Sequence, residues 1–294
     1  MNGDYIPEIW PGPMEGIGKA AFVRAVNSLR LTERWMTPFL RLSQEMPKRS
    51  KLETFISPFT EYGSPVTVQL MGTDAGLLGE CAAVFMELGA AGININFGCP
   101  SKRVTSGGAG GGALRKPDKL ADFCARVKSG AGKSTPLSVK LRAGWDDPED
   151  MRTVLPQLAN CGAVDKIFFH YRTVGELYGF LPEEERLRRF SLAAELCKPL
   201  PLIINGDFAT AEDTLRILKN IPVHGVMIAR PWMRDPFLLR RFCGDDTPAE
   251  EGREIFLSQL QKLGVSGGAL LELVRMLWGV NDPHFKKLLI KQKN

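Results

Sequence analysis

The chain alternates short apolar runs with longer segments of helical periodicity, and this alternation most constrains its fold. Six runs have the character of buried parallel strands, at residues 66–70, 93–97, 137–141, 166–170, 201–205 and 225–229. Helical patterns lie between them, at residues 75–88, 117–128, 150–160, 186–196 and 211–218. Thr210 is a candidate N-cap for the last helix, with Asp213 three residues on. Weaker strand signals before Pro13 and near residues 34–40 bring the expected strands to eight.

Eight strand and helix units within about 235 residues predict a (β/α)8 TIM barrel, an α/β fold with a closed parallel sheet. A doubly wound open sheet is the alternative, but no Gly-x-Gly-x-x-Gly pattern follows the first strand. Strand signals end near residue 236, and apolar residues then recur at helical spacing over residues 253–263, 268–278 and 282–293. We therefore expect two domains, a barrel over residues 1–235 and a small helical domain over residues 236–294.

Composition places the chain among globular proteins, because 294 residues with 44% hydrophobic and 24% charged content support one large core and a small appendage. Its six cysteines form no Cys-x-x-Cys pair and have no histidine nearby, so neither a metal site nor a disulfide framework is indicated. No signal peptide and no membrane span are recognisable. We expect a cytoplasmic monomer.

The most informative segment for function runs from residue 93 to residue 117. Residues 93–97 alternate apolar side chains with asparagine, as a strand does, and Gly98-Cys99-Pro100 then breaks the strand. This exposes a thiol just past the carboxyl end of the strand, where parallel α/β sheets carry their chemistry. The glycine-rich run at residues 107–112 offers few side chains to pack, and we expect it to form a mobile lid.

This segment closely resembles the catalytic-cysteine loop of the tRNA-dihydrouridine synthases, flavoenzymes that reduce a uridine in tRNA. The match includes Asn-x-Gly-Cys-Pro-Ser-Lys and the glycine-rich run, and it is most similar to a bacterial subfamily that acts on a D-loop uridine. Three further motifs depart from the usual pattern: Gly12-Pro13-Met14-Glu15-Gly16 for Ala-Pro-Met-x-Gly, His170-Tyr171-Arg172-Thr173 for His-Gly-Arg-Thr, and Ala229-Arg230 for Gly-Arg. Gln69, the run Ser138-Val139-Lys140-Leu141-Arg142 and Asn205-Gly206-Asp207 follow it.

The resemblance implies FMN as cofactor, NADPH as reductant, tRNA as partner and Cys99 as the catalytic residue. The side chains and backbone that it assigns to FMN are those of Pro13, Met14, Glu15, Gln69, Lys140, His170, Asn205, Gly206, Asp207, Ala229 and Arg230. Those that it assigns to the uridine or the tRNA are Asn96, Lys102, Arg142 and Arg172. It also implies that the barrel is the catalytic domain and the helical domain helps to hold tRNA.

Several of these positions have a physical reason. Gly206 lets backbone N–H groups approach a phosphate, and Arg230 supplies a positive charge, although Ala229 crowds the approach slightly. Lys140 can stabilise negative charge on the N1–C2 edge of a reduced flavin. His170 lies at a strand end with Arg172 two residues on, which favours a role in the site.

The chemistry follows from the uracil ring, whose C5=C6 bond is conjugated to the C4 carbonyl. Hydride from reduced FMN should add to C6, and C5 then requires a proton. Because a thiol is mostly protonated near neutrality, Cys99 is a suitable donor of that proton. Asn96 is placed to read the polar edge of the base. The uridine must leave its stack to reach a barrel mouth, at a cost of a few kcal/mol.

Basic residues cluster, although the net charge is only +5. The clusters are Arg186, Arg188 and Arg189, then Arg240 and Arg241, then Lys286, Lys287, Lys291 and Lys293. They suit a polyanion partner, whereas charge alone favours solvated helix faces.

Three functions from different classes therefore compete. The first is a tRNA-dihydrouridine synthase. The second is an FMN barrel acting on a small molecule, like a dihydroorotate dehydrogenase or an ene-reductase. The third is an RNA-binding protein that has lost its flavin, which would be colourless.

Overall fold

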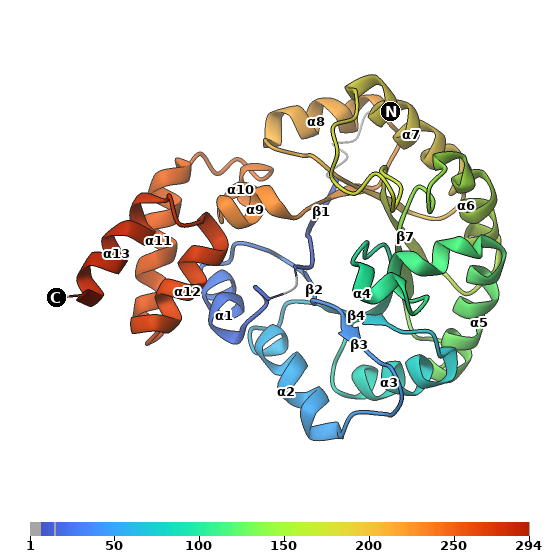
Figure 1. The fold of residues 1–294 in the computed structure, drawn as a ribbon, viewed down its shortest axis with the longest axis horizontal. Coiled ribbons are helices and arrows are strands. Elements are labelled where there is room, and N and C mark those ends of the chain that lie inside the picture. The colour runs from blue at the N-terminus through green and yellow to red at the C-terminus, as the bar shows by residue number, and fades with distance from the viewer. Residues whose placement is uncertain (1–6, 15, 294) are drawn as a thin grey trace.

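The structure, a computed structural model, describes residues 7–14 and 16–293, and side chains as far as residue 290. Its core is one parallel sheet surrounded by helices (Figure 1). The strands are β1 (Glu8–Pro11), β2 (Trp35–Met36), β3 (Leu40–Arg41), β4 (Val66–Met71), β5 (Gly92–Phe97), β6 (Leu137–Arg142), β7 (Lys166–His170), β8 (Leu202–Asn205) and β9 (Gly225–Ile228).

The strands follow the order β1-β9-β8-β7-β6-β5-β4-β2, and each neighbouring pair is parallel. The first and last strands of this order, β1 and β2, lie side by side, which brings the sheet to a nearly closed barrel. The predicted TIM barrel is therefore confirmed. The open doubly wound sheet is excluded because the two end strands meet.

The second barrel strand is broken into two short pieces. Both β2 and β3 pair with β4, through Val66 and Thr67 for β2 and through Leu70 and Met71 for β3. Pro38 lies between the two pieces, and proline has no N–H to donate to a sheet ladder. The weak strand signal at residues 34–40 reflects this interruption.

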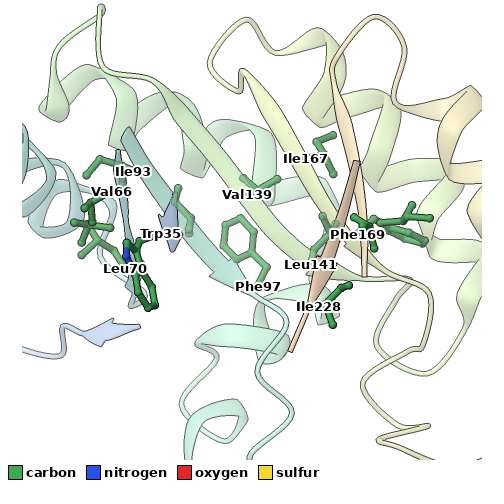
Figure 2. Close-up of a cluster of buried hydrophobic side chains, with 14 of the residues drawn as sticks. Trp35, Val66, Leu70, Ile93, Phe97, Val139, Leu141, Ile167, Phe169 and Ile228 are labelled. Carbon is green, nitrogen blue, oxygen red and sulfur yellow. The ribbon is translucent and has the colours of Figure 1, made fainter. Parts of the chain in front are cut away.

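The two faces of the strands carry different side chains, as the two-residue period of a strand requires. The outward face is apolar and packs under the helices, as Figure 2 shows for Val66, Phe97 and Leu141 among others. Inside the barrel, an apolar layer closes its lower part and consists of Trp10, Met36, Phe168, Ile203 and Met227. Polar side chains lie on the same inward face nearer the carboxyl ends of the strands, where the site forms.

The helices confirm the periodicity of the sequence. In chain order they are α1 (Ala20–Ser28), α2 (Arg49–Thr60), α3 (Ala75–Glu87), α4 (Lys102–Thr105), η1 (Gly110–Arg115), η2 (Pro117–Lys119), α5 (Leu120–Ala131), η3 (Pro148–Asp150), α6 (Met151–Asn160), α7 (Glu183–Leu196), α8 (Ala211–Asn220), α9 (Arg230–Arg234), α10 (Leu238–Arg241), α11 (Ala249–Lys262), α12 (Gly267–Trp278) and α13 (Pro283–Lys293). Thr210 caps α8 as predicted, because its side-chain oxygen accepts a hydrogen bond from the backbone N–H of Asp213 at 3.2 Å.

The three carboxyl-terminal helices, α11 to α13, pack beside the barrel next to α1 (Figure 1). Phe256 of α11 meets Phe22 of α1 edge to face at 5.6 Å, and Phe22 meets Trp232 of α9 at 5.5 Å. One apolar core therefore continues from the barrel into these helices. A boundary at residue 235 stays a prediction. Among the described residues, no helix has the length and apolar character needed to cross a bilayer.

The second half of the glycine-rich run is packed, whereas Gly107 is exposed and Gly108 is half-buried, so the expectation that the whole run forms a mobile lid is wrong. Gly110, Gly111 and Gly112 are buried in the short helix η1. A Cβ on Gly111 would lie 2.7 Å from Val174 and 2.9 Å from the carbonyl oxygen of Cys99, and one on Gly112 would lie 2.6 Å from a backbone oxygen. Glycine is needed here for close approach rather than for freedom.

Candidate active site

A cavity of about 520 Å³ opens at the carboxyl ends of the barrel strands, a size typical of small-ligand sites. Most residues predicted for the site line it: Pro13, Met14, Gln69, Asn96, Cys99, Lys140, Arg142, His170, Asn205, Gly206, Asp207, Ala229 and Arg230. Lys102 begins the short helix α4 with its side chain exposed, and neither it nor Arg172 lines the cavity. Glu15 lies outside the described residues.

The half-buried thiol of Cys99 sits on a loop that is held in place from two sides. The side-chain oxygen of Asn96 accepts hydrogen bonds from the backbone N–H groups of Gly98, at 3.0 Å, and of Cys99, at 2.9 Å. The carbonyl oxygen of Cys99 accepts from the N–H of Gly111 at 3.0 Å. The sequence break after β5 thus becomes a fixed turn that presents the thiol to the cavity.

Asn96 also belongs to a chain of amide side chains inside the barrel. Its Nδ2 donates to Oε1 of Gln69 at 2.9 Å, Gln69 donates to Asn94 at 2.8 Å, and Asn94 donates to Ser138 at 2.9 Å. Only the second N–H of the Asn96 amide is left to face a ligand, and it suits a carbonyl oxygen. Asn94 was missed by the sequence analysis, although it shares the inward face with Asn96.

Two cations of β6 lie in the cavity without a carboxylate partner among the described residues. Burial, reinforced by the charge of Arg142, lowers the pKa of Lys140 to about 8. Arg142 is buried and donates to the carbonyl oxygens of Gly98, Thr173 and Leu177 at 2.8–2.9 Å. Burial also lowers the pKa of Arg142. Buried cations without counter-charges lower the stability of the folded state. They therefore mark this part of the cavity as a binding site for an electron-rich ligand.

His170 is a neutral hydrogen-bonding group. Burial, together with the charges of Arg142 and Lys140, lowers its pKa well below the usual value. Its Nδ1 accepts a hydrogen bond from the backbone N–H of Arg172 at 3.2 Å, which places the ring proton on Nε2. Nε2 lies beside Gly206, so this N–H is directed to the corner of the cavity that residues 205–207 form.

That corner is built around Asp207. Its carboxylate accepts from the Tyr171 hydroxyl and from Arg172, each at 2.5 Å, and from Arg230 at 3.2 Å. Burial opposes ionisation of Asp207, yet the hydrogen bonds from Arg172 and Tyr171 hold its pKa below the usual value. Gly206 has a φ of 129°, and the ring of Tyr171 leaves no room for a Cβ there. Backbone and positive charge thus meet as an anion site requires.

Arg172 has a different place from the one expected of a tRNA contact. Only 3% of the residue is exposed, and its Nε donates to the carbonyl oxygen of Gly179 at 2.9 Å. Because its other bond goes to Asp207, the geometry assigns it to supporting the corner rather than to the surface.

A family model described as Dihydrouridine synthase matches residues 11–263 of the chain. The chain belongs to the dihydrouridine synthase family. It is therefore a flavin-dependent oxidoreductase that acts on the uridine C5=C6 bond, with FMN as cofactor and NADPH as reductant. The resemblance of the cysteine loop is confirmed.

Named relatives agree with this family. A tRNA-dihydrouridine(16) synthase of Pseudomonas syringae pv. tomato is 29% identical over 248 residues, covering 83% of this chain and 75% of the relative. One of Vibrio cholerae serotype O1 is 32% identical over 217 residues, covering 74% of this chain and 62% of the relative.

Solved structures show the same fold. Histamine dehydrogenase from Rhizobium sp. 4-9 superposes with a TM-score of 0.62 at 12% identity, over 90% of this chain and 50% of that one. Morphinone reductase superposes with a TM-score of 0.57 at 11% identity, over 83% of this chain and 89% of that one.

Two departures from the dihydrouridine synthase pattern explain each other. Gly12 replaces the usual alanine directly after β1, and Ala229 replaces the usual glycine directly after β9. A Cβ on Gly12 would lie 2.5 Å from the Cβ of Ala229, so only one of the two positions has room for a methyl group. The methyl group of Ala229 therefore crowds position 12, directly after β1. Glycine at position 12 has no methyl group, and this relieves the crowding.

The third departure, Tyr171 for glycine, also has a partner within the site. The Tyr171 ring stacks on His170 at 5.3 Å, and its hydroxyl bonds Asp207. A side chain that the usual motif lacks thus stabilises this corner of the cavity through one stacked ring and one hydrogen bond. The sequence analysis noted the substitution but had no signal for its partner, because Asp207 lies in the loop after the next strand, β8.

Proposed function

We propose that this chain reduces uridine 16 of tRNA to 5,6-dihydrouridine. The position is supported by the relatives named as tRNA-dihydrouridine(16) synthases. The observation that carries the chemistry is one cavity that holds the fixed Cys99 thiol together with Lys140 and Arg142, to which no described residue offers a carboxylate partner.

The described residues fit FMN. Lys140 and Arg142 supply positive charge that no carboxylate of the described residues compensates, which suits the electron-rich edge of a flavin. Gly206 and Arg230 suit its phosphate, and Pro13, Met14 and Ala229 line the same cavity. When bound, FMN supplies a hydride to C6 of the uracil ring.

The residues of this chain then complete the reduction at C5. Addition at C6 leaves enolate character between C5 and the C4 carbonyl, and the Cys99 thiol donates the missing proton to C5. Asn96 holds the loop that carries the thiol and offers its remaining N–H to a uracil carbonyl. The guanidinium of Arg142 ties the thiol loop to the loop after β7, which keeps the two walls of the mouth at a fixed separation.

The tRNA partner adds requirements outside the cavity. The uridine must be extruded from its stack, and positive surface around the mouth offsets the cost. We assign residues 236–294 to tRNA binding, with exposed lysines at Lys286 and Lys287 on α13. Lys102, exposed beside the thiol loop, remains a proposed tRNA contact. A cytoplasmic location and a monomeric state belong to the same proposal.

The two half-reactions test this proposal. The purified protein, loaded with FMN and mixed anaerobically with NADPH, should lose its flavin absorbance. Addition of tRNA that lacks dihydrouridine should restore the absorbance and leave dihydrouridine at position 16. Reoxidation by a small enone but not by tRNA would favour the small-molecule alternative, and a protein that stays colourless after FMN is added would favour the flavin-less one.

A further inference from the structure

The loop between β7 and α7 presents apolar side chains to solvent at the rim of the cavity. Leu177 is 50% exposed, Tyr178 is 57% exposed and Phe180 is 91% exposed. Phe180 is the most exposed large hydrophobic side chain of the described residues. Exposed apolar groups that gather beside a binding site are a mark of an interaction surface.

This loop is held by buried arginines, so the exposure is not that of a flexible segment. Arg142 donates to the carbonyl oxygens of Thr173 and Leu177, and Arg172 donates to that of Gly179. Glu176 of the same loop is paired with Arg189 at 2.8 Å. These bonds hold the backbone at Leu177 and Gly179, on either side of Tyr178 and directly before Phe180.

The surroundings of the tip are cationic. The Arg230 guanidinium lies 4.7 Å from the centre of the Tyr178 ring, and that of Arg142 lies at 5.5 Å. Among the described charged residues that line the cavity, four are cations and one is an anion: Lys140, Arg142, Arg230 and Arg234, against Asp207. Exposed apolar side chains beside cations match an unpaired nucleotide, which offers a ring face and a phosphate together.

We propose that Leu177 and Phe180 form a platform on which the base adjacent to the extruded uridine stacks. The inference rests on the proposed tRNA substrate and goes beyond it, because it concerns the neighbouring nucleotide and not the reacting one. Tyr178 lines the cavity itself, whereas Leu177 and Phe180 lie outside the lining and face solvent. Such a platform holds the backbone of the tRNA open while the uridine occupies the cavity.

The experiment measures tRNA binding by the FMN-loaded protein with Phe180→Ala, Phe180→Trp and a control, Tyr62→Ala. Tyr62 is an aromatic residue that is 42% exposed and lies outside the cavity. Losing one stacked base weakens binding by about 5-fold or more. We expect that loss for Phe180→Ala, recovery for Phe180→Trp, and no change for the control. With 2-aminopurine beside the target uridine, its fluorescence should be quenched by the wild type and less by Phe180→Ala.

Equal tRNA affinity and equal quenching for Phe180→Ala and wild type would overturn the platform. So would a change of sedimentation coefficient in Phe180→Ala with tRNA binding intact, which would assign the tip to a second copy of this chain. Failure of the proposed function gives a different result, because tRNA would then not reoxidise the reduced FMN of the wild-type protein. That result would remove the tRNA substrate and, with it, this inference.

Discussion

The two cations that β6 places in the barrel mouth and the arginines of α7 look alike in the sequence and differ in the structure. On α7, Arg188 pairs with Glu185 and Glu149, and Arg189 pairs with Glu176 and Glu185. In the mouth, Lys140 and Arg142 have no carboxylate partner among the described residues. The α7 cluster was expected to suit a polyanion, but carboxylates of the chain itself already neutralise it.

This difference shows that neighbouring carboxylates decide whether the charge of a cation is available to a ligand. A paired arginine on a helix face adds little to binding, because its charge is already compensated. A buried cation without a partner destabilises the fold unless a ligand compensates it. The same rule applies to Arg240 and Arg241, which pair with Asp245 and Asp235.

The largest effect is expected at the Cys99 thiol, which lines the same cavity as these cations. Cys99→Ala should leave reduction of FMN by NADPH intact but slow reoxidation by tRNA by roughly 10²-fold or more, because a positioned acid is lost. Stopped-flow absorbance follows the two steps separately, and Cys243→Ala, at an exposed cysteine, is the control. Reoxidation at the wild-type rate would make Cys99 structural, with the proton coming from water or from another group such as Lys102.

A second test compares Arg188 of α7 with Arg230, which lines the cavity and shares the carboxylate of Asp207 with Arg172. Arg230→Glu should weaken FMN binding by about 10-fold or more, since a charge-assisted hydrogen bond to phosphate is replaced by repulsion. Arg188→Glu makes the same charge change on α7 and should leave FMN binding unchanged. Fluorescence titration with FMN and with riboflavin identifies the phosphate as the cause, because riboflavin binding should not respond. Equal effects of the two variants would break the distinction between the regions.

The barrel and the order of its site motifs were predictable, because both depend on local patterns. Strand runs such as residues 166–170 and the cap at Thr210 need only the period of the chain and one neighbouring side chain. What failed depended on contacts between distant segments. Gly110 and Gly111 pack against Cys99, and the bonds of Arg172 to Asp207 and Gly179 withdraw it from the surface. Composition carries no signal for either contact.

A third test compares two substitutions that should change the free energy of unfolding in opposite directions. Lys140→Met should raise the free energy of unfolding of the apoprotein by about 1–3 kcal/mol at pH 7, because burial shifts the lysine pKa down from its usual value. Arg189→Met should lower it by about 1.5–3 kcal/mol, because Glu176 loses its arginine partner and Glu185 loses one of two. Urea unfolding measures both, and a loss of stability in Lys140→Met would contradict the comparison.

The same lysine gives a pH dependence with a definite sign. Between about pH 8 and 10.5 the unfolded chain holds a proton that the folded chain has released at Lys140. The contribution of this group therefore makes the apoprotein more stable as pH rises through that window. The dependence should disappear in Lys140→Met, and its persistence there would assign it to other groups.

The smallest effect is expected on α13, where the comparison extends to the tRNA. Lys286 and Lys287 are exposed, and no carboxylate pairs with them among the described residues, so they resemble the mouth cations in charge but not in burial. Replacing both with Gln should weaken tRNA binding a few-fold and reduce the salt slope by about 0.9 for each lost phosphate contact. FMN binding should not change, because these lysines lie outside the cavity. Arg188→Gln is the matched control, and its salt slope should equal that of the wild type because its charge is already paired. An unchanged slope for the lysine variant would show that α13 presents only a solvated face, and the proposed tRNA-binding role of residues 236–294 would lose its support.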